Sequence, residues 1–449
     1  MARRITLKYA AGLTMLCLTF PLLGCFKNIS SAEEVDVEKV ERIISEVVAS
    51  DLKIAKIPGP SADILEYLNY ATEMSPDILA LRQAELGAES NVLLATSKTR
   101  PQLSANSQIG GYSTDASLGN FQEGASINVT ASQLLFDGGQ VDGEISISRL
   151  QLEISRVATD GEINRISAEA AGAIIAISLA EQELEALSKF KKEIKPHAEQ
   201  LERMAGSGLI DRSILDEISS QLLEIDISEE EARSNLRLAQ VEYSKFFGDL
   251  QSPRKSPKFP LSISSKIEGD LVPNGTPAVR ERALRALLAE KQVEVARSAF
   301  SPKVNAQLGS SSPMNADESI SAQAGILISY QLSDGGAREA KLSTAKNNLE
   351  QSLSTLQSTV ENTEAVLRQL QERAVSAMEI IQLSEQKLPI LLDQLRVAET
   401  QIQTGQADIS KVFGIKLQTN QLESRIRRGK ADLEQTKFDL AAALGLLSN

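Results

Sequence analysis

The sequence contains few of the residues on which most enzyme and metal sites depend. Its 449 residues include one histidine, His197, and two cysteines, Cys17 and Cys25. One copy of the chain can therefore assemble no Cys/His metal site, no Ser-His-Asp triad and no redox pair. His197 lies in a polar stretch, which is typical of a solvated helix residue. The sequence predicts no catalytic residue, no metal site and no cofactor.

Aromatic residues and positive charge are also scarce. There are 11 Phe, 6 Tyr and no Trp, so small and aliphatic side chains have to do most of the packing. The 47 Lys and Arg residues are outnumbered by 60 Asp and Glu residues, which gives a net charge of −13 at pH 7. This surplus of negative charge argues against a nucleic-acid partner, because the phosphate backbone repels it.

The first 24 residues have the pattern of an export signal. Basic residues near the start precede an apolar run that is too short to span a membrane comfortably. The tetrad Leu22-Leu23-Gly24-Cys25 resembles a bacterial lipobox, which implies that Cys25 is acylated and becomes the first residue of the mature chain. Phe26 follows it instead of Asp, which in such lipoproteins implies sorting to the outer membrane. The alternative is a plain signal peptide with an incidental cysteine.

The rest of the chain repeats itself, which is the most informative feature of the sequence. The segment from Ser75 matches the segment from Thr276, and Pro101 matches Pro302, at an offset of 201 residues. Three later matches share an offset of 197 residues: Asp137-Gly138-Gly139 with Asp334-Gly335-Gly336, Gly208 with Gly405, and Gly248 with Gly445. The offset changes by four residues between Pro101 and Asp137, so the two copies differ in length there. A segment that tolerates a change of length is expected to be a surface loop.

The repeat sets the predicted domain boundaries. Residues 1–24 form the signal peptide, and residues 25–60 form an N-terminal lipid-anchored segment. Each copy, 61–250 and 276–449, is expected to hold a helix, two strands and a long helical hairpin. The joining residues 251–275 are rich in proline, which disfavours helix and predicts an irregular equatorial linker.

Each copy contains segments in which apolar and polar residues alternate. Residues from Ala125 to Ala131 alternate in this way, and those from Ile320 to Leu332 repeat the pattern, with partner strands starting at Gln102 and Lys303. A soluble antiparallel sheet would alternate as well. In an exported chain without a long apolar helix after its signal, the pattern favours a closed membrane barrel. Four strands are fewer than the roughly eight of the smallest barrels, so closure requires several chains.

One long helical arm is predicted in each copy. In both copies 69 residues separate the corner glycine from the tip glycine: Gly139 from Gly208, and Gly336 from Gly405. A helix of that length spans roughly 100 Å at 1.5 Å per residue. Two shorter helices, 76–99 and 211–247, together have nearly the same length as this long helix. We therefore predict a tube wall in which one long helix packs against two stacked short ones. A soluble coiled-coil rod or a helical bundle is the alternative.

The two hairpin turns carry a glycine followed three residues later by an aspartate. Gly208 and Gly405 accept positive φ, and Asp211 and Asp408 are positioned to cap the returning helix. A helical hairpin explains these residues completely. The more specific interpretation is that both hairpin tips also contact a partner protein.

The two Asp-Gly-Gly sequences lie where a strand is expected to meet a long helix. They are Asp137-Gly138-Gly139 and Asp334-Gly335-Gly336. We interpret them as strand-to-helix corners and not as phosphate sites, because no P-loop Lys-Ser/Thr follows.

These features together resemble the TolC-like outer-membrane efflux proteins. The resemblance rests on the proline-entered strands at Pro101 and Pro302, on Leu-Phe-Asp-Gly-Gly at 135–139 with Leu-Ser-Asp-Gly-Gly at 332–336, and on the paired tip glycines. It covers the chain from about Ser61 onward, and the lipobox is similar to that of the lipoprotein members. It implies an α+β membrane protein. Its homotrimer would form a twelve-stranded β-barrel, with four strands per chain, that continues into a long α-helical periplasmic tunnel.

The resemblance also implies a function, that of a passive export duct and not of an enzyme. Such a duct belongs to a tripartite efflux or type I secretion system in the outer membrane. It docks onto a periplasmic membrane-fusion adaptor, which links it to an inner-membrane pump or ABC transporter. The cargo would be small toxic compounds or secreted proteins.

The resemblance assigns adaptor contacts to the hairpin tips: Gly208, Leu209, Asp211, Arg212, Gly405, Asp408 and Ser410. Relatives commonly narrow the periplasmic entrance with a ring of aspartates from the second hairpin. In this sequence Lys411 and Gly414 stand near those places and are the aperture candidates. An acidic gate is therefore not carried over to this chain.

Two other classes of protein fit part of the sequence. A lipid-anchored periplasmic coiled-coil adaptor or structural rod would share the hairpins, but it needs neither four alternating strands nor paired Asp-Gly-Gly corners. An envelope enzyme on a helical scaffold is disfavoured, because the sequence offers no catalytic constellation.

Overall fold

The computed structural model describes residues 57–59, 62–112, 122–207, 212–253, 258–260, 271–312, 319–403 and 409–448. All of them lie in the unit Ala55–Asn449, which is distinct from the unit Met1–Ile54. Cys25, the predicted lipidation site, lies outside the described residues. The same holds for five of the predicted tip residues: Gly208, Leu209, Asp211, Gly405 and Asp408.

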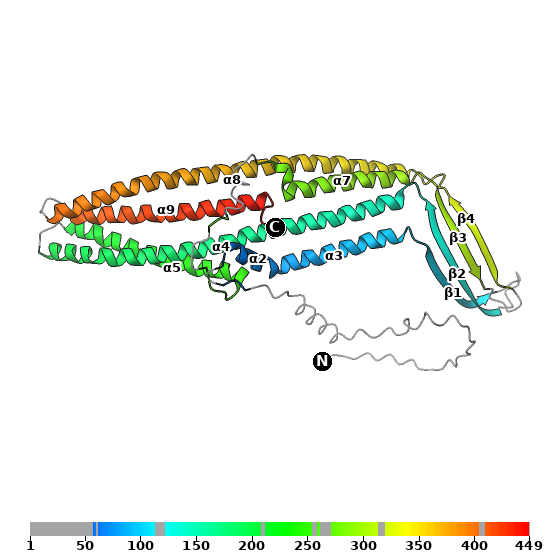
Figure 1. Cartoon of the computed structure of the whole chain (residues 1–449), viewed down its shortest axis with the longest axis horizontal. Helices are drawn as coiled ribbons and strands as arrows, with labels where there is room; N and C mark the ends of the chain where they lie inside the picture. The colour runs from blue at the N-terminus through cyan, green and yellow to red at the C-terminus, as the bar shows by residue number, and fades with distance from the viewer. Residues whose placement is uncertain are drawn as a thin grey trace, which may run out of the picture. The chain divides into compact units, whose positions relative to one another are not determined.

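From α3 and α7 onward, the two copies form the same succession of helices and strands, as the duplication predicted (Figure 1). The first copy holds α2 (Ile64–Glu73), α3 (Pro76–Ser97), β1 (Gln102–Tyr112), β2 (Gln122–Phe136), α4 (Gln140–Gly206) and α5 (Arg212–Phe247). The joining segment ends in the 3-10 turn η1 (Pro273–Gly275). The second copy holds α7 (Pro277–Ser298), β3 (Lys303–Ser311), β4 (Ser321–Ser329), α8 (Ala337–Gln403) and α9 (Ile409–Ala443). The short helix α2 was not predicted.

The shorter helices α3 and α7 begin with the same local chemistry. Ser75 and Thr276 are their N-cap residues, and each hydroxyl oxygen accepts a hydrogen bond from the amide three residues further on, at 3.5 Å and 3.4 Å respectively. A proline follows each cap at the first helical position, where an N–H would have no partner within the helix. The segments that match at an offset of 201 residues therefore encode the same helix start.

Each long helix packs along two shorter helices. The α4 helix contacts α3 and α5, and α8 contacts α7 and α9 (Figure 1). The α4 helix also contacts α7 and α9, which joins the two copies in one wall. Each long helix has 67 residues and therefore measures about 100 Å. The predicted wall of one long helix against two shorter ones is confirmed.

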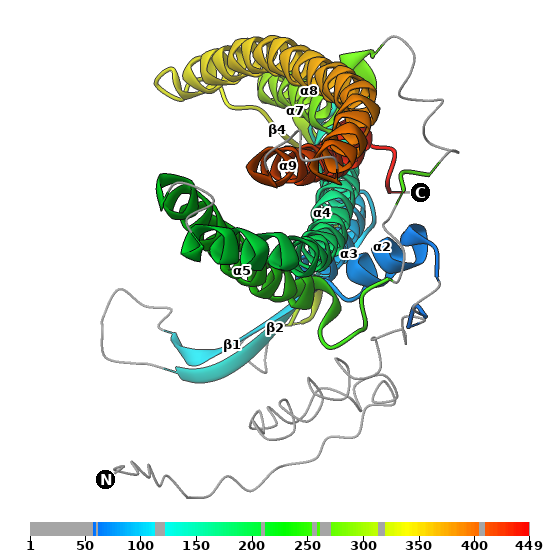
Figure 2. The same ribbon diagram turned by 90° about the vertical axis from the view of Figure 1, so that its left-hand side faces the viewer.

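Several aromatic residues pack in one apolar cluster with α2, which lies on the outer side of the curved row of helices in Figure 2. Tyr67 is fully buried, and its ring centroid lies 5.7 Å from that of Phe247. The Tyr67 hydroxyl donates to the carbonyl oxygens of Gly59 and Gln251 at 3.2 Å and 3.3 Å. The Tyr243 hydroxyl donates to the same Gln251 oxygen at 3.2 Å. These bonds fasten the irregular segment that follows α5 to the wall.

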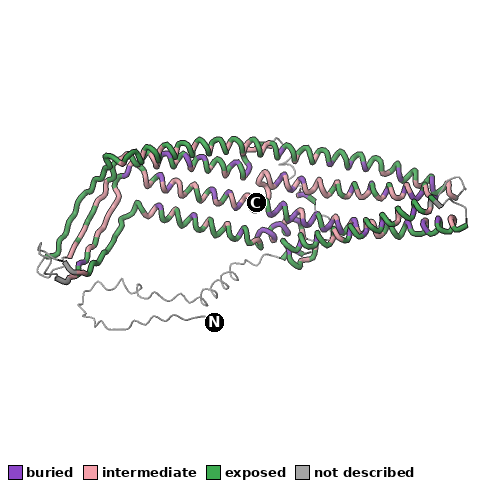
Figure 3. Tube along the Cα trace, turned by 180° about the vertical axis from the view of Figure 1, so that it is seen from behind, coloured by how far each residue is buried: buried purple, intermediate pink, exposed green. Residues whose placement is uncertain are grey.

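Helix α4 contains a long apolar stretch. By length and composition, α4 is the one helix in the described part of the chain that is able to cross a membrane. The sequence analysis expected no long apolar helix after the signal. As a statement about length and composition, that expectation is wrong. However, 61% of the apolar window is buried inside the wall, and Ala170, Ala171 and Ile174 are fully covered. The stretch is thus packed core, as Figure 3 shows by its buried positions along α4.

Candidate channel-forming surfaces

Both Asp-Gly-Gly sequences form a corner between a strand segment and a long helix. Asp137 is buried, and its carboxylate accepts hydrogen bonds from the amides of Gly139, Gln140 and Val141 at 2.9, 3.1 and 2.8 Å. In the second copy, Asp334 accepts from the amide of Gly336 at 3.1 Å and from the amide and Nε of Arg338 at 3.0 and 2.9 Å. All four glycines have positive φ, which glycine adopts without strain.

The corner carboxylates also bear on the phosphate alternative. The first amides of a helix are the groups that would bind a phosphate. In both corners an aspartate of the chain already accepts hydrogen bonds from amides there. The geometry is that of a capped helix start.

The four strands form one antiparallel sheet in the order β1-β2-β3-β4. Strands β2 and β3 pair across the two copies, and each edge strand has a single neighbour within the described chain. A free edge presents unpaired backbone amides and carbonyls, which a bilayer does not tolerate.

Strand pairing sorts apolar and polar side chains onto opposite faces of this sheet. Residues directly opposite each other in antiparallel strands share a face. One row runs through Leu103, Ala131, Leu308 and Ala324, and the next row runs through Ser104, Thr130, Gly309 and Gln323. Apolar side chains on the first face are largely exposed, with Leu103 at 76% and Leu308 at 60%. One face therefore suits lipid, and the other suits water.

The helical wall has exposed apolar residues along both of its edges. In Figure 2, α5 and α8 lie at the two ends of the curved row of helices. Exposed apolar side chains on α5 are Leu223, Ile227, Leu238 and Val241, and those on α8 include Leu383, Ile390 and Val397. The three α8 residues are spaced by seven, so they form one stripe. Such edges are typical of surfaces that pack against another helix.

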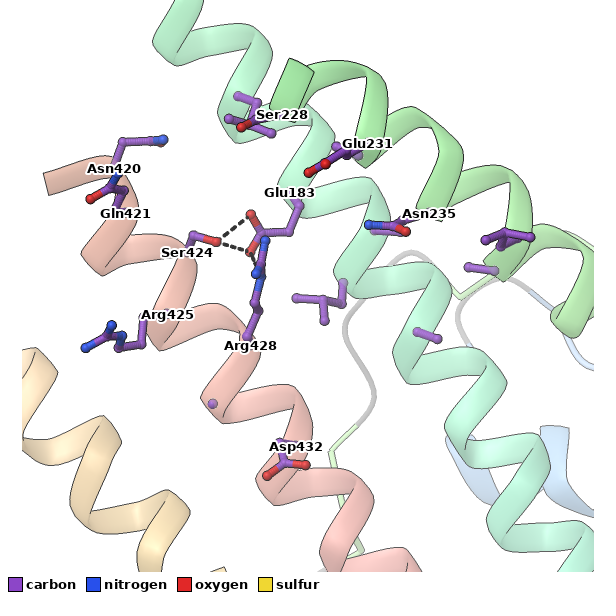
Figure 4. Close-up of a pocket in the computed structure, with 18 of the residues that line it drawn as sticks. Glu183, Ser228, Glu231, Asn235, Asn420, Gln421, Ser424, Arg425, Arg428 and Asp432 are labelled. Atoms are coloured by element: carbon purple, nitrogen blue, oxygen red, sulfur yellow. Dashed lines mark hydrogen bonds and ion pairs between the residues drawn. The ribbon is translucent and has the colours of Figure 1, made fainter. Parts of the chain in front are cut away.

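A buried ion pair joins the two hairpins within the wall. Glu183 on α4 accepts hydrogen bonds from Ser424 Oγ at 2.9 and 3.0 Å and from Arg427 Nε at 3.3 Å, both on α9 (Figure 4). Lys191 on α4 pairs with Asp226 and Glu229 on α5 at 2.8 and 2.7 Å. These pairs are separated by up to 244 residues in sequence, and no spacing in the sequence indicated them.

Toward the hairpin tips, an apolar cluster holds three helices together. It comprises Phe190, Ile194 and Leu201 of α4, Ile218 and Ile225 of α5, and Ile409 and Phe413 of α9. Of the predicted aperture residues, Lys411 is exposed and Gly414 is half-buried, on the first turns of α9. Neighbouring Val412 and Phe413 are fully buried. This part of α9 is therefore anchored by its apolar side chains.

The family model for outer membrane efflux proteins matches residues 67–248 and 272–446. The chain belongs to this family. Each matched segment covers most of one copy of the duplication. The TolC-like resemblance is thereby confirmed, and the function of this efflux protein is that of an outer-membrane export channel.

Solved structures with the same fold include outer-membrane channels. VceC of Vibrio cholerae has a TM-score of 0.74 and 14% identity, with 85% of this chain and 96% of that chain covered. CusC has a TM-score of 0.73 and 15% identity, with 85% of this chain and 92% of that chain covered. The open state of the outer-membrane channel MtrE of Neisseria gonorrhoeae has a TM-score of 0.70 and 15% identity, with 85% of this chain and 88% of that chain covered. Comparison with the curated proteins finds no match. At such identities the likeness concerns the fold.

The efflux protein also places one carboxyl in a setting that favours its protonated form. Burial raises the pKa of Asp439 on α9, and nearby Asp432 adds to the rise. A hydrogen bond that Gln435 Nε2 donates to Asp439 Oδ1 at 2.6 Å, together with the charge of Arg373, opposes it. The folded chain therefore retains a proton over a pH range in which the unfolded chain has lost it.

This pKa shift makes stability depend on pH. Because the folded pKa is raised, stability decreases as pH rises from about 4 through the folded pKa. We expect Asp439→Asn to raise the melting temperature of the efflux protein at pH 8 and to leave it unchanged below about pH 4. Exposed Asp249→Asn is the matched control. Equal melting temperatures of wild type and Asp439→Asn at every pH would contradict this expectation.

Proposed function

We propose that three copies of this chain assemble into a single channel through the outer membrane. The observation that carries the proposal is the sheet, whose edge strands β1 and β4 each have a single neighbour within the described chain and whose apolar face extends across all four strands. Pairing of β4 of one copy with β1 of the next would close a barrel and remove every free edge. Three copies give the twelve strands that the resemblance implies.

The helical edges support the same arrangement. The apolar stripes on α5 and α8 differ from each other and lie at opposite ends of the row, so they suit a head-to-tail contact that closes into a ring. A lipid-anchored rod is the weaker candidate, since it would leave the apolar face of the sheet in water.

We propose further that the channel is passive and that the chain is not an enzyme. The match to the outer membrane efflux proteins supports this proposal. An inner-membrane pump or ABC transporter would supply the energy for export. Nucleotide hydrolysis by the purified trimer without its partners would contradict this proposal.

We also propose that the hairpin tips contact a periplasmic membrane-fusion adaptor. Most of the tip residues lie outside the described residues, whereas Arg212 begins α5 and Ser410 lies in the first turn of α9. Lys411 and Gly414 follow Ser410 and remain our candidates for the aperture. Photo-cross-linking from each tip in cells tests the contact, and the absence of adaptor adducts from both tips would argue against it.

Acylation of Cys25 is the proposed membrane anchor. It is supported by the lipobox resemblance of Leu22-Leu23-Gly24-Cys25. The mass of the mature N-terminal peptide tests it directly. A peptide that starts elsewhere or lacks acyl chains would leave the barrel as the sole attachment.

The trimer is tested by placing a charge in an apolar edge. We expect Leu383→Asp, at a side chain that is 66% exposed in the single chain, to convert the trimer into monomers, because three carboxylates would be buried in the three contacts. Native mass spectrometry of the detergent-extracted protein measures the ratio of trimer to monomer. Gln382→Asp, at an exposed polar position of the same helix that does not share a face with Leu383, should stay trimeric. Equal trimer fractions in both variants would show that this edge is not an interface.

A further inference from the structure

The polar face of the sheet carries almost no charge. This face holds the row through Ser104, Thr130, Gly309 and Gln323 and every second residue along each strand from that row. Its described side chains are serine, threonine, asparagine and glutamine, with glycines, two leucines and one charged residue between them. The charged residue is Lys303. A chain with a net charge of −13 therefore places a lone positive charge on the described part of this face.

Lys303 lies where the sheet joins the helical wall, because it is the first residue of β3 (Figure 1). Its side chain is exposed. Strand register places it opposite Ser329 of β4, with Cα atoms about 4.5–5.5 Å apart. The flexible lysine stem can keep its ammonium group in the water that covers this face.

Two further charges stand beside Lys303 on the wall. Lys98, which caps the end of α3, pairs with Glu144 on α4 at 2.7 Å, and the two side chains are 54% and 26% exposed. Burial would raise the pKa of Glu144, but hydrogen bonds and the charges of Lys98 and Lys303 lower it overall. Lys303 is thus close enough to act on Glu144, although the two form no ion pair. Two lysines and one glutamate leave a surplus of one positive charge in each chain.

Nearby acids do not offset this surplus. Asp137 is buried and accepts hydrogen bonds from three backbone amides, and Asp334 pairs with Arg338 at 2.9 Å. Asp142 is two positions from Glu144 on α4, so it points to roughly the opposite side of that helix. The other charges on residues 97–101, 297–302 and 337–341 are three cations and one anion: Arg100, Arg297, Lys341 and Glu339.

We propose that Lys303 forms an anion-attracting ring where the helical tunnel opens into the barrel, and that anionic solutes are favoured over cationic ones at this level of the duct. The inference rests on the trimer proposed above, in which the polar face of the sheet lines the lumen. Three copies place three lysines at one height of an otherwise uncharged lining. Rings of lysine or arginine favour anions in pores, because charge in a passage with low-dielectric walls concentrates solutes of the opposite charge.

The test measures the electrostatic potential beside Lys303 with a cysteine at position 329. The lipidated Ser329→Cys trimer, in phospholipid nanodiscs, reacts with two methanethiosulfonates of similar size, the anionic sulfonatoethyl and the cationic trimethylammonioethyl reagent. Mass spectrometry gives both rate constants, and their ratio does not depend on how much of the thiol is ionised. We expect Lys303→Gln to lower the ratio of the anionic to the cationic rate about tenfold at low salt, because it removes a unit charge next to the thiol. Salt at about 1 M should abolish this difference.

Two variants control for charge and place. Lys303→Arg should keep the original ratio, because it keeps the positive charge. Lys189→Gln removes an exposed lysine far along α4 and should also leave the ratio unchanged. A ratio that is the same with and without Lys303→Gln would overturn the inference.

A second cysteine position tests the proposed channel separately. Ile328 is opposite Val304 on the apolar face, so Ile328→Cys should react slowly with both reagents. Equal rates at positions 328 and 329 would show that both faces meet water and would overturn the channel. Slow reaction at 328, together with a ratio at 329 that Lys303→Gln does not change, would overturn the lysine ring alone.

Discussion

Replacing Glu183 by alanine is expected to lower the free energy of unfolding by about 3–5 kcal/mol, because Arg427 is left largely buried without a counter-charge. The side chains of Glu183 and Arg427 are only 9% and 20% exposed. Removal of the carboxylate also leaves the Ser424 hydroxyl without the acceptor that it has at 2.9 Å. Thermal unfolding of the trimer, followed by the loss of helical circular dichroism, measures the effect.

Two further variants make this expectation specific. Glu183→Leu combined with Arg427→Met should recover most of the lost stability, because two apolar side chains of similar size need no counter-charge. Lys430→Gln removes a pair between α9 and Glu385 of α8 whose side chains are 58% and 50% exposed, so it should change the melting temperature little. If Glu183→Ala and Lys430→Gln lower the melting temperature equally, the buried pair is not a major link between α4 and α9.

Replacing Gly138 by alanine is expected to destabilise the corner between sheet and wall far more than replacing its repeat counterpart Gly335. Both have positive φ, 74° and 68°, which costs about 1–2 kcal/mol for an alanine. At Gly138 an added Cβ would also overlap with the Cβ and Oγ of Ser301, with the carbonyl oxygen of Ser298 at 3.2 Å. At Gly335 nothing lies within 4 Å. Overpacking adds about 1–3 kcal/mol at the first corner alone.

The melting temperatures of the two alanine variants measure this difference. Combining Gly138→Ala with Ser301→Gly removes both overlapping side-chain atoms. The loss of stability in this double variant should therefore shrink to the loss seen in Gly335→Ala. Equal melting temperatures of the two single variants would mean that the backbone around Ser301 moves to accommodate the methyl group.

Features that are repeated along the chain, or that depend on local spacing, were determined by the sequence. The offsets of 201 and 197 residues predicted two equivalent sets of elements, and the glycine intervals predicted long helices that span Gln140–Gly206 and Ala337–Gln403. Alternation from Ala125 to Ala131 predicted a strand within β2. Caps, helix periodicity and strand alternation act between residues a few positions apart, so the sequence itself displays them.

Only the tertiary structure decided which distant residues meet. The apolar row through Leu103, Ala131, Leu308 and Ala324 depends on strand register across both copies, and Glu183 meets Arg427 through the packing of α4 on α9. Helix α2 was missed because its aromatic core is completed by residues far along the chain, such as Phe247. Equivalent glycines 138 and 335 likewise differ only in what packs against them. Such contacts arise from the packing of whole elements, which sequence spacing does not record.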